Sequence, residues 1–434
     1  MSSVGGDGSA VTINPAGGAM FLNSQADLSL SLFNKSSDVL GQNASVSQLA
    51  LPSANVMFHL PVANSSWKAL NFGLTSSRQQ NLGQNIIYRQ NTAVGNSMVD
   101  FFLARADGIP VEDLEFEDPY GWLAYQAFII DTVGGMPGLY TSSAKGESQQ
   151  RIEFVRSGRT NDVDFSFSGN YDNKIYIGAS LGFSSILVNN EFTSIENFED
   201  SSITQVAFRE TNDREGSAFL FKVGAIFRPI EPLRISVYYH APRLYRLTSL
   251  LDISAEASFK TGPPGTSDIA FQQFLYRYRL PARMGLGFSY ILSKTLLVSM
   301  DYERMNLRST QLAALSNELG GGADPNFFSF ENSQINSGYS VLNTVRFGLE
   351  AKLQNVYLRA GVQYRSNPLS REFSDFSEQM TISGGVGYRM KTMSLDFFAS
   401  HASNTEGVLP YTGAVLQKVT HTAINMGVGA SFFF

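Results

Sequence analysis

From residue 25 to residue 434 the chain repeats one pattern, in which apolar and polar side chains alternate. In "IYIGASLGFS", apolar residues from Ile175 to Phe183 occupy every second position, and mostly small or polar residues lie between them. Because successive side chains of an extended strand point to opposite faces, this pattern predicts a strand with one apolar and one polar face. The segments "VRFGLEAKL" and "VYLRAGVQYR" alternate in the same way.

The alternation predicts an all-β fold with fourteen strands, at 25–34, 53–61, 66–76, 151–170, 173–191, 203–229, 232–258, 268–291, 294–309, 340–353, 355–366, 378–391, 392–403 and 415–434. Short turns such as "NYDN" and "LQN" follow the even-numbered strands, and longer polar connections follow the odd-numbered ones. An even number of antiparallel strands, with short turns at one end and long loops at the other, indicates a transmembrane β-barrel of the outer-membrane type.

The polar face of these strands carries charges, and this decides which face meets the membrane. A charge that faces hydrocarbon at mid-depth costs about 2–4 kcal/mol, so the polar face is expected to line the lumen. A soluble β-sandwich, the alternative, would bury its apolar faces between two sheets, but its strands rarely reach the lengths predicted here. The charged residues assigned to the lumen are Asp301, Glu303, Arg346, Glu350, Arg359, Arg365, Arg389 and Asp396.

The last strand ends in "MGVGASFFF", and its apolar face runs from Ile424 to Phe434. Aromatic residues are enriched at the rims of membrane barrels, so Phe434 is expected at the periplasmic rim. A C-terminal aromatic strand also resembles the recognition signal of bacterial outer-membrane barrels, which implies the barrel-assembly machinery as a partner through Phe434. The alternative is a buried edge strand of a soluble sheet.

Composition excludes several other classes of protein. The net charge of −6 argues against a nucleic-acid partner, and no run of about 18 apolar residues predicts a transmembrane helix. The start "MSSVGGDGSA" is no signal peptide, so an exported protein would have lost that signal. The four histidines show neither metal-ligand spacing nor a local serine–histidine motif. No metal, cofactor or catalytic residue is predicted.

Residues 1–24 do not alternate, and such a segment can lie outside the barrel or plug it. The stretch "GGDGSAVTINPAG", with Asn14, Pro15 and Ala16, resembles the hatch motif of the long-chain fatty-acid transporter family (FadL/TodX type). The resemblance implies a fourteen-stranded barrel in the bacterial outer membrane, with an N-terminal hatch at 1–24 and the barrel at 25–434. The family's hatch is longer than this segment, so the chain departs from the pattern at its front.

A second resemblance lies in the third strand, at "NFGL", where Phe72 and Gly73 match the point at which the family's strand kinks into the lumen. Glycine inside a strand often marks a bulge or a bend. In the family this kink opens a gap in the wall, through which substrate leaves sideways into membrane lipid. The simpler interpretation is that Gly73 is one of the 38 glycines of an ordinary barrel.

Residues 77–150 form the longest connection, which the strand order places outside the cell. Two helices are predicted in it, "NSMVDFFLARAD" and "DPYGWLAYQAFIID", the second with Asp118 as N-cap and Pro119 in its first turn. Their apolar residues either pack together as a lid or form a groove that captures hydrophobic molecules. The candidate ligand-binding residues are Phe101, Phe102, Trp122, Leu123 and Phe128.

The resulting hypothesis is passive transport of hydrophobic molecules, such as long-chain fatty acids, with release through the barrel wall. Burying an acyl chain gains about 0.8 kcal/mol per methylene, so such a molecule requires an apolar pocket rather than a water-filled pore. Two alternatives stay open: a structural or partner-binding barrel of an envelope assembly, and a general porin. The sequence does not identify the cargo.

Overall fold

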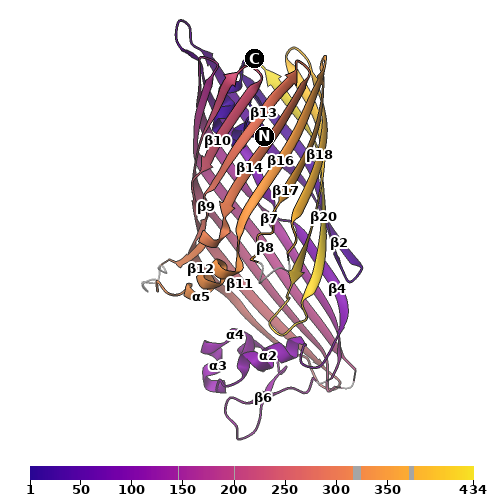
Figure 1. Ribbon diagram of the computed structural model, residues 1–434. Helices are drawn as coiled ribbons and strands as arrows, with labels where there is room; N and C mark the ends of the chain where they lie inside the picture. Colours follow the sequence, from indigo (N-terminus) through magenta and orange to yellow (C-terminus); the bar gives the residue numbers. More distant parts are fainter. Residues whose placement is uncertain (145, 200, 316–323, 371–375) are drawn as a thin grey trace.

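The protein is a closed antiparallel β-barrel with a small helical region at one end (Figure 1). The computed structural model describes residues 1–434 apart from 145, 200, 316–323 and 371–375. Strand β1 pairs with β2 on one side and with β20, the last strand, on the other, which closes the wall. None of the described helices is long and apolar enough to cross a membrane.

The strands of the wall are β1 (Gln25–Val39), β2 (Gln42–Pro61), β3 (Trp67–Asn81), β4 (Gln84–Thr92), β7 (Ser148–Tyr171), β8 (Ile175–Phe198), β9 (Ile203–Ile230), β10 (Leu233–His240), β11 (Arg243–Phe259), β12 (Gly265–Leu280), β13 (Arg283–Ser293), β14 (Leu296–Asn306), β15 (Gln311–Ala314), β16 (Val341–Leu353), β17 (Val356–Arg365), β18 (Gln379–Arg389), β19 (Met393–Val408) and β20 (Gln417–Phe433). A separate two-stranded sheet contains β5 (Asp131–Thr132) and β6 (Tyr140–Thr141). The helices are α1 (Gly8–Ile13), α2 (Met98–Ala106), α3 (Val111–Glu117), α4 (Pro119–Gln126) and α5 (Ser329–Gly338), with 3₁₀ turns η1 (Pro15–Met20) and η2 (Leu307–Ser309).

The wall contains fourteen antiparallel traverses, as the alternation predicted. Four of these traverses are each divided into two strands: β3 with β4, β10 with β11, β12 with β13, and β14 with β15. Two of the breaks lie at Pro242 and Pro281. Proline has no N–H to donate to a ladder, so it interrupts a strand that the alternation alone predicts to be continuous.

The first hairpin differs from the prediction, which placed a long polar connection at 35–52. Instead β1 and β2 extend to a two-residue turn at Leu40 and Gly41, whose φ angles of 55° and 76° are those of a tight hairpin turn. The residues around it, such as "NKSSD" and "QNASVSQ", are polar on both faces. Where both faces of a hairpin meet water, no alternation marks its strands.

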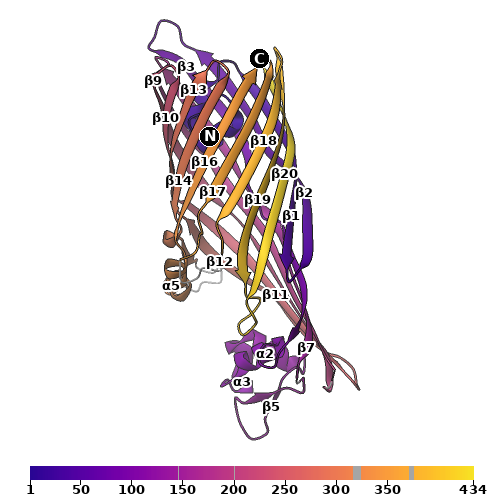
Figure 2. The ribbon, with the colours of Figure 1, turned by 45° about the vertical axis from the view of Figure 1, so that its right-hand side comes forward.

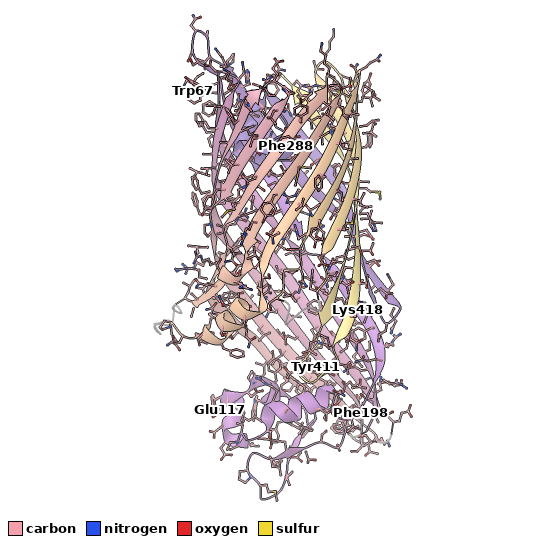
Figure 3. The ribbon with its side chains drawn as sticks, viewed as in Figure 1. Trp67, Glu117, Phe198, Phe288, Tyr411 and Lys418 are labelled. Carbon is pink, nitrogen blue, oxygen red and sulfur yellow. The ribbon has the colours of Figure 1, made fainter. Side chains whose placement is uncertain are left out.

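The two faces of the wall have the polarity that the sequence predicted. On β8, Phe183 is 66% exposed on the outer surface, whereas Ser184 is fully buried on the lumen side. The predicted lumen charges Asp301 and Glu303 are likewise buried. At the rim, Phe434 is exposed and its ring lies 6.3 Å from that of Phe58. Figure 3 shows side chains covering the outside of the wall, with Phe288 on its flank and Trp67 near the end that holds the C-terminus.

Candidate functional site

Three short helices, α2, α3 and α4, lie at the end of the barrel away from the C-terminus (Figures 1 and 2). A capping box starts α2, in which the Ser97 hydroxyl accepts from the Asp100 N–H and the Asp100 carboxylate accepts from the Ser97 N–H. The Asp118 carboxylate caps α4 by accepting from the Gly121 N–H at 2.8 Å. Both predicted helices are therefore present, and α3 is an element that the sequence did not predict.

The structure brings four of the five candidate ligand-binding residues together. Phe102 and Leu123 are completely buried in one apolar cluster, and Phe101 and Trp122 pack against it while partly exposed. Phe128 lies apart from them, with 69% of its surface exposed and a φ of 57°. We call the apolar cluster around Phe102 and Leu123 the lid cluster. It covers the barrel end as a packed lid, and in this conformation its two central residues are closed to the outside.

The lid cluster continues onto the lumen face of the wall, which sequence reasoning missed. The ring of Phe208 lies 5.6 Å from that of Phe102 and 6.0 Å from that of Phe192. Phe154 and Ile253 belong to the same group. A side chain of this size gains about 1.5–3 kcal/mol when it is buried. The sequence contained one signal for this. Near the lid ends of β7, β8, β9 and β11, the lumen-facing positions carry apolar side chains, whereas the same positions farther from the lid carry polar ones.

A buried carboxylate, that of Glu196 on β8, fastens the lid to the wall. It accepts from the Met98 N–H at 2.8 Å, at the start of α2, and from the side-chain amide of Gln150. The Tyr411 hydroxyl lies 3.4 Å from it and donates to the Asn96 carbonyl at 2.9 Å. Figure 3 shows Tyr411 between the barrel end and the helices. One carboxylate thus joins α2, two wall strands and the loop before β20.

Raising the pH is expected to loosen the attachment of the lid, because Glu196 ionises. A strand crosses hydrocarbon in roughly 10 residues. Glu196 is near the end of β8, which starts at Ile175, so it lies outside that layer. Burial raises the pKa of the Glu196 carboxyl from 4.5 to about 7, although hydrogen bonds from Met98, Gln150 and Tyr411 lower it. The closed lid therefore favours the protonated form. Lid closure should be strongest below pH 4.5, weaken as the pH rises to about 7, and change little above that.

Amide exchange of α2, expressed as protection factors at pH 5 and pH 8, measures this effect. Glu196→Gln should remove the difference between the two values, because a neutral amide does not titrate. Glu117→Gln, in the exposed last position of α3, serves as the control and should keep it. Equal protection of α2 at both pH values in the unmodified protein would contradict the mechanism.

Next to the lid cluster, on the side toward the C-terminal end of the barrel, the lumen face becomes polar and positively charged. Arg156 lies directly opposite Asn190 in the ladder, and its Nε donates to the Asn190 side chain at 2.7 Å. Arg214 belongs to the next row, and Lys35 donates to Gln84 at 2.9 Å. Phe154 and Phe192 are one lumen position above Arg156 and Asn190. We call Lys35, Arg156 and Arg214 the cationic row.

Two carboxylates, Glu406 and Glu210, lie near the cationic row among the described residues; Glu210 is close to Arg214 and accepts from the Tyr120 hydroxyl at 3.0 Å. Glu406 accepts from His421 at 2.7 Å and from the amide of Gln84 at 3.0 Å. Gln84 is also the ladder partner of Arg156 and the acceptor for Lys35. With three cations against two carboxylates, this level of the lumen has a small excess of positive charge.

Farther from the lid, a block of paired charges lies on the lumen face of the nearby strands β7, β9 and β11. Both guanidinium Nη atoms of Arg243 donate to the two oxygens of Asp162 at 2.8 Å. Lys222 donates to Asp164 at 2.7 Å, and all four groups are buried. Two cations and two carboxylates make the block neutral, and such bidentate, hydrogen-bonded pairs are the strong ones. The block makes this side of the lumen polar, so an acyl chain finds no apolar surface on it.

Residues 1–24 lie in the lumen beyond this block, and a cavity of about 560 Å³ remains between the start of the segment and the strands from β16 to β20. The Ser2 N–H donates to Asp301 at 2.8 Å, and His240 Nε2 lies 2.7 Å from the Ile13 carbonyl. The Asn71 amide donates to the Gly18 carbonyl at 2.6 Å. Wall strands far apart in sequence therefore hold the segment from several sides.

The motif residues Asn14, Pro15 and Ala16 lie buried at the centre of this segment. The Asn14 side chain accepts from the Ala16 N–H at 3.0 Å and donates to the Ser2 carbonyl at 3.1 Å. Two lumen glycines make room for them: a Cβ on Gly178 would lie 2.4 Å from the Pro15 carbonyl, and a Cβ on Gly224 would lie 1.9 Å from Asn14 Oδ1. The strands lack side chains here because the Pro15 backbone and the Asn14 side chain occupy the space.

The strand irregularity predicted at Gly73 is not found there. Gly73 is paired with Met57 on β2 and with Ser166 on β7, and neither ladder shifts register at this residue. Phe72 faces outward, with its ring 5.1 Å from that of Phe167. The prediction of a bulge is wrong in its position, because a glycine with regular ladder partners on both sides marks neither a bulge nor a gap between strands. The register shifts of β3 against β7 lie instead at 67–69 and 78–80.

The wall does contain a weak seam, and it lies above Gly73. The β2–β3 ladder ends at the pair Ser53 and Ser77, and no backbone ladder joins the rest of β2 to β4 in the described wall. Side chains bridge the seam instead: the amide of Gln42 exchanges two hydrogen bonds with the backbone of Arg89, and Asn85 donates to the Ser45 carbonyl at 3.1 Å.

A cavity of about 550 Å³ extends from β2 and β3, beside this seam, across β7, β8 and β9 to β11. Its lining combines Gln48, which faces the lumen, with Leu49, which faces outward, and reaches Arg78 on β3. Next to it, Gly158 of β7 has a φ of 140°, opposite the register shift of β3. The wall is thus interrupted at this point in two neighbouring ladders.

No family model and no curated protein matches the sequence. Solved structures do match over the full chain: the Ralstonia pickettii toluene transporter TbuX (15% identity, TM-score 0.55), a Pseudomonas aeruginosa FadL homologue (14%, 0.57) and the Pseudomonas putida toluene transporter TodX (17%, 0.53). Each alignment covers 100% of this chain and 95–96% of the other. This chain therefore has the fold of the FadL- and TodX-type barrels, as its hatch-like motif and its strand count led us to expect.

Proposed function

We propose that the protein is a FadL-type transporter of the bacterial outer membrane, which passively moves hydrophobic molecules from outside into the membrane. The observation that carries the proposal is the lid cluster placed directly above the cationic row. Phe154 and Phe192 offer an apolar surface, and Arg156 and Arg214 offer charge one or two positions below. An amphipathic molecule can bind such a site with its apolar chain against the phenylalanines and its charged group against the arginines.

The cationic row favours a long-chain carboxylate as cargo. The similar structures include toluene transporters and a monoaromatic hydrocarbon channel, so those proteins accept neutral aromatic molecules. A neutral hydrocarbon gains nothing from an excess of positive charge, whereas a carboxylate forms charge-assisted hydrogen bonds with arginine. Each methylene that enters the lid cluster adds about 0.8 kcal/mol.

The proposed route of the cargo depends on which parts of the lumen are occupied and where the wall lacks backbone pairing. In this proposal residues 1–24 are the hatch, with Asn14, Pro15 and Ala16 at its centre, and 25–434 are the barrel. Residues 77–150 supply the extracellular lid, apart from the part of that range that forms β3 and β4. The charge block and the hatch obstruct the direct way down. The exit lies at the membrane-side end of the seam, beside the outward-facing Leu49, rather than at Phe72 and Gly73, because the hairpin beyond that end is polar on both faces.

The lid residues divide the capture step between them. Phe128, exposed on the outside, makes the first contact, and Phe101, Phe102, Trp122 and Leu123 receive the cargo once the lid opens. Phe434, exposed at the rim, is the proposed contact of the barrel-assembly machinery. Neither the porin nor the structural alternative has a comparable observation in its favour.

Exchanging Arg156 and Arg214 for glutamine is expected to weaken binding of hexadecanoate on the order of ten-fold, since two charge-assisted contacts are lost. Binding of its uncharged methyl ester should hardly change. Tryptophan fluorescence quenching by both ligands in a non-alkyl detergent measures the effect. Arg209→Gln, an outward-facing arginine paired with Glu191 at 3.0 Å, is the control.

Two outcomes count against the proposal. Equal losses for acid and ester would show that the arginines support the pocket rather than recognise the charge. Mass spectrometry of the freshly purified protein supplies an independent check, because a transporter of this kind should retain amphiphiles. Protein that carries none and binds neither ligand would remove the transport hypothesis.

A further inference from the structure

Three arginines gather on the outer surface of the barrel, away from the lumen site. Arg246 on β11 and Arg277 on β12 are direct cross-strand partners. Arg279 lies two residues farther along β12, opposite Leu244. Because these residues share the parity of Leu244, which is 53% exposed on the outer surface, their side chains leave the wall on the same side. We call them the arginine patch.

The arginine patch lies where the apolar belt of the wall ends. The traverse starts at Leu233, at the end of the barrel that holds the C-terminus, and Val237 and Leu244 face outward along it. A tilted strand crosses the hydrocarbon in about 9–11 residues. Leu244 is therefore near the far boundary of the hydrocarbon, and Arg246 is at the level of lipid headgroups on the side of the lid.

The patch is unfavourable unless an anion is present. Like charges directly opposite each other on one face of a sheet destabilise it, and Arg246 with Arg277 is such a pair. Among the described residues no carboxylate forms an ion pair with any of the three. Arg279 donates to the amide oxygen of Gln311 at 3.4 Å, a neutral partner. The nearest outward carboxylate in the ladder, Glu215, is opposite Thr248 instead.

We propose that the arginine patch binds the phosphate groups of a phosphorylated lipid in the leaflet on the lid side of the membrane. Arginine forks match phosphate oxygens bidentately, and several arginines within reach of one another suit a headgroup with more than one phosphate. The apolar outer surface below the patch, from Val237 to Leu244, is placed to contact the acyl chains of the same lipid. The occupant is thus a lipid rather than a free anion, and the inference is independent of the cargo.

Binding of two probes to the purified full chain tests the proposal: diphosphoryl lipid A and the same lipid without phosphates. Native mass spectrometry in detergent reports both. The variant R246Q/R277Q/R279Q should bind the diphosphoryl probe on the order of ten-fold more weakly and the phosphate-free probe unchanged. The control K68Q/K294Q/K391Q removes three cations near the opposite end of the barrel and should bind both probes as the unmodified protein does.

The proposal is overturned if the patch variant and the control bind the diphosphoryl lipid equally well. It is also overturned if millimolar inorganic phosphate displaces that lipid, because the patch would then be a site for free anions. Arg277→Gln alone provides a measurement that does not depend on the triple variant's folding. Removing one member of the like-charged pair should leave thermal stability in detergent unchanged or raised, and should reduce the stabilisation that added diphosphoryl lipid confers.

Discussion

Replacing Gly178 by leucine is expected to drive residues 1–24 out of their place in the lumen and to make the barrel conduct ions. The new Cβ would lie 2.4 Å from both the carbon and the oxygen of the Pro15 carbonyl, and backbone cannot move aside as a flexible side chain can. Overpacking of this kind typically costs about 1–3 kcal/mol. The wall around Gly178, where β8 is paired with both β7 and β9, should persist while the segment is displaced. Single-channel recording in planar bilayers measures the result.

The matched control is Gly429→Leu. Gly429 also faces the lumen from a wall strand, but a Cβ there would meet nothing closer than 3.9 Å. Both variants carry the same loss of glycine and the same gain of a large side chain, so only the clash with the segment differs. Steady conduction by the unmodified protein, at the level of the Gly178 variant, would favour the porin alternative instead.

Fastening β2 to β4 is the second change with a large expected effect. The chain contains no cysteine, so Ser45→Cys with Asn85→Cys introduces the only two thiols. These residues face each other across the seam, where Asn85 donates to the Ser45 carbonyl. Joining them with a short thiol crosslinker should reduce uptake of radiolabelled hexadecanoate in cells by about ten-fold or more, if the seam is the exit; cleaving the link should restore it.

A second crosslink, between β2 and β3, distinguishes a blocked exit from a general stiffening of the wall. Ser53 and Ser77 are the last ladder partners of β2 and β3, just below the seam. Linking cysteines at those two positions joins strands that are already hydrogen-bonded, so uptake should stay unchanged. If both crosslinks lowered uptake equally, general stiffening of the wall would explain the loss; if neither did, cargo would leave by another way.

The strands and their faces were predictable because the membrane and the lumen differ in polarity. Every traverse between them needs one apolar and one polar face, and alternation such as that from Ile175 to Phe183 records this requirement. The two lid helices were predictable for an equally local reason, because their caps at Ser97 and Asp118 adjoin them in sequence. The helix α3 begins at Pro110 without a side-chain cap, and no such signal marked it.

The position of the weak seam could not be predicted, because it depends on which strands become neighbours. Gly73 has a suggestive sequence around it, yet its two partners hold it in register. The seam above Ser77 arises because β3 breaks before Gln84 while β2 continues to pair with β1. Likewise Gly178 and Gly224 read as ordinary strand glycines until the buried segment beside them is known.

The closure of the wall between its first and last strands has a consequence for the order of assembly. Residues 1–24 are tethered to Gln25, the first residue of β1, and they are held by His240, Asp301 and other residues from the middle of the chain. Strand β20 completes the ring only by pairing with β1. A ring that closed early would have to admit the segment afterwards through its open end, into a lumen already lined by side chains. We therefore expect the middle strands to assemble around residues 1–24, and the pairing of β1 with β20 to form last.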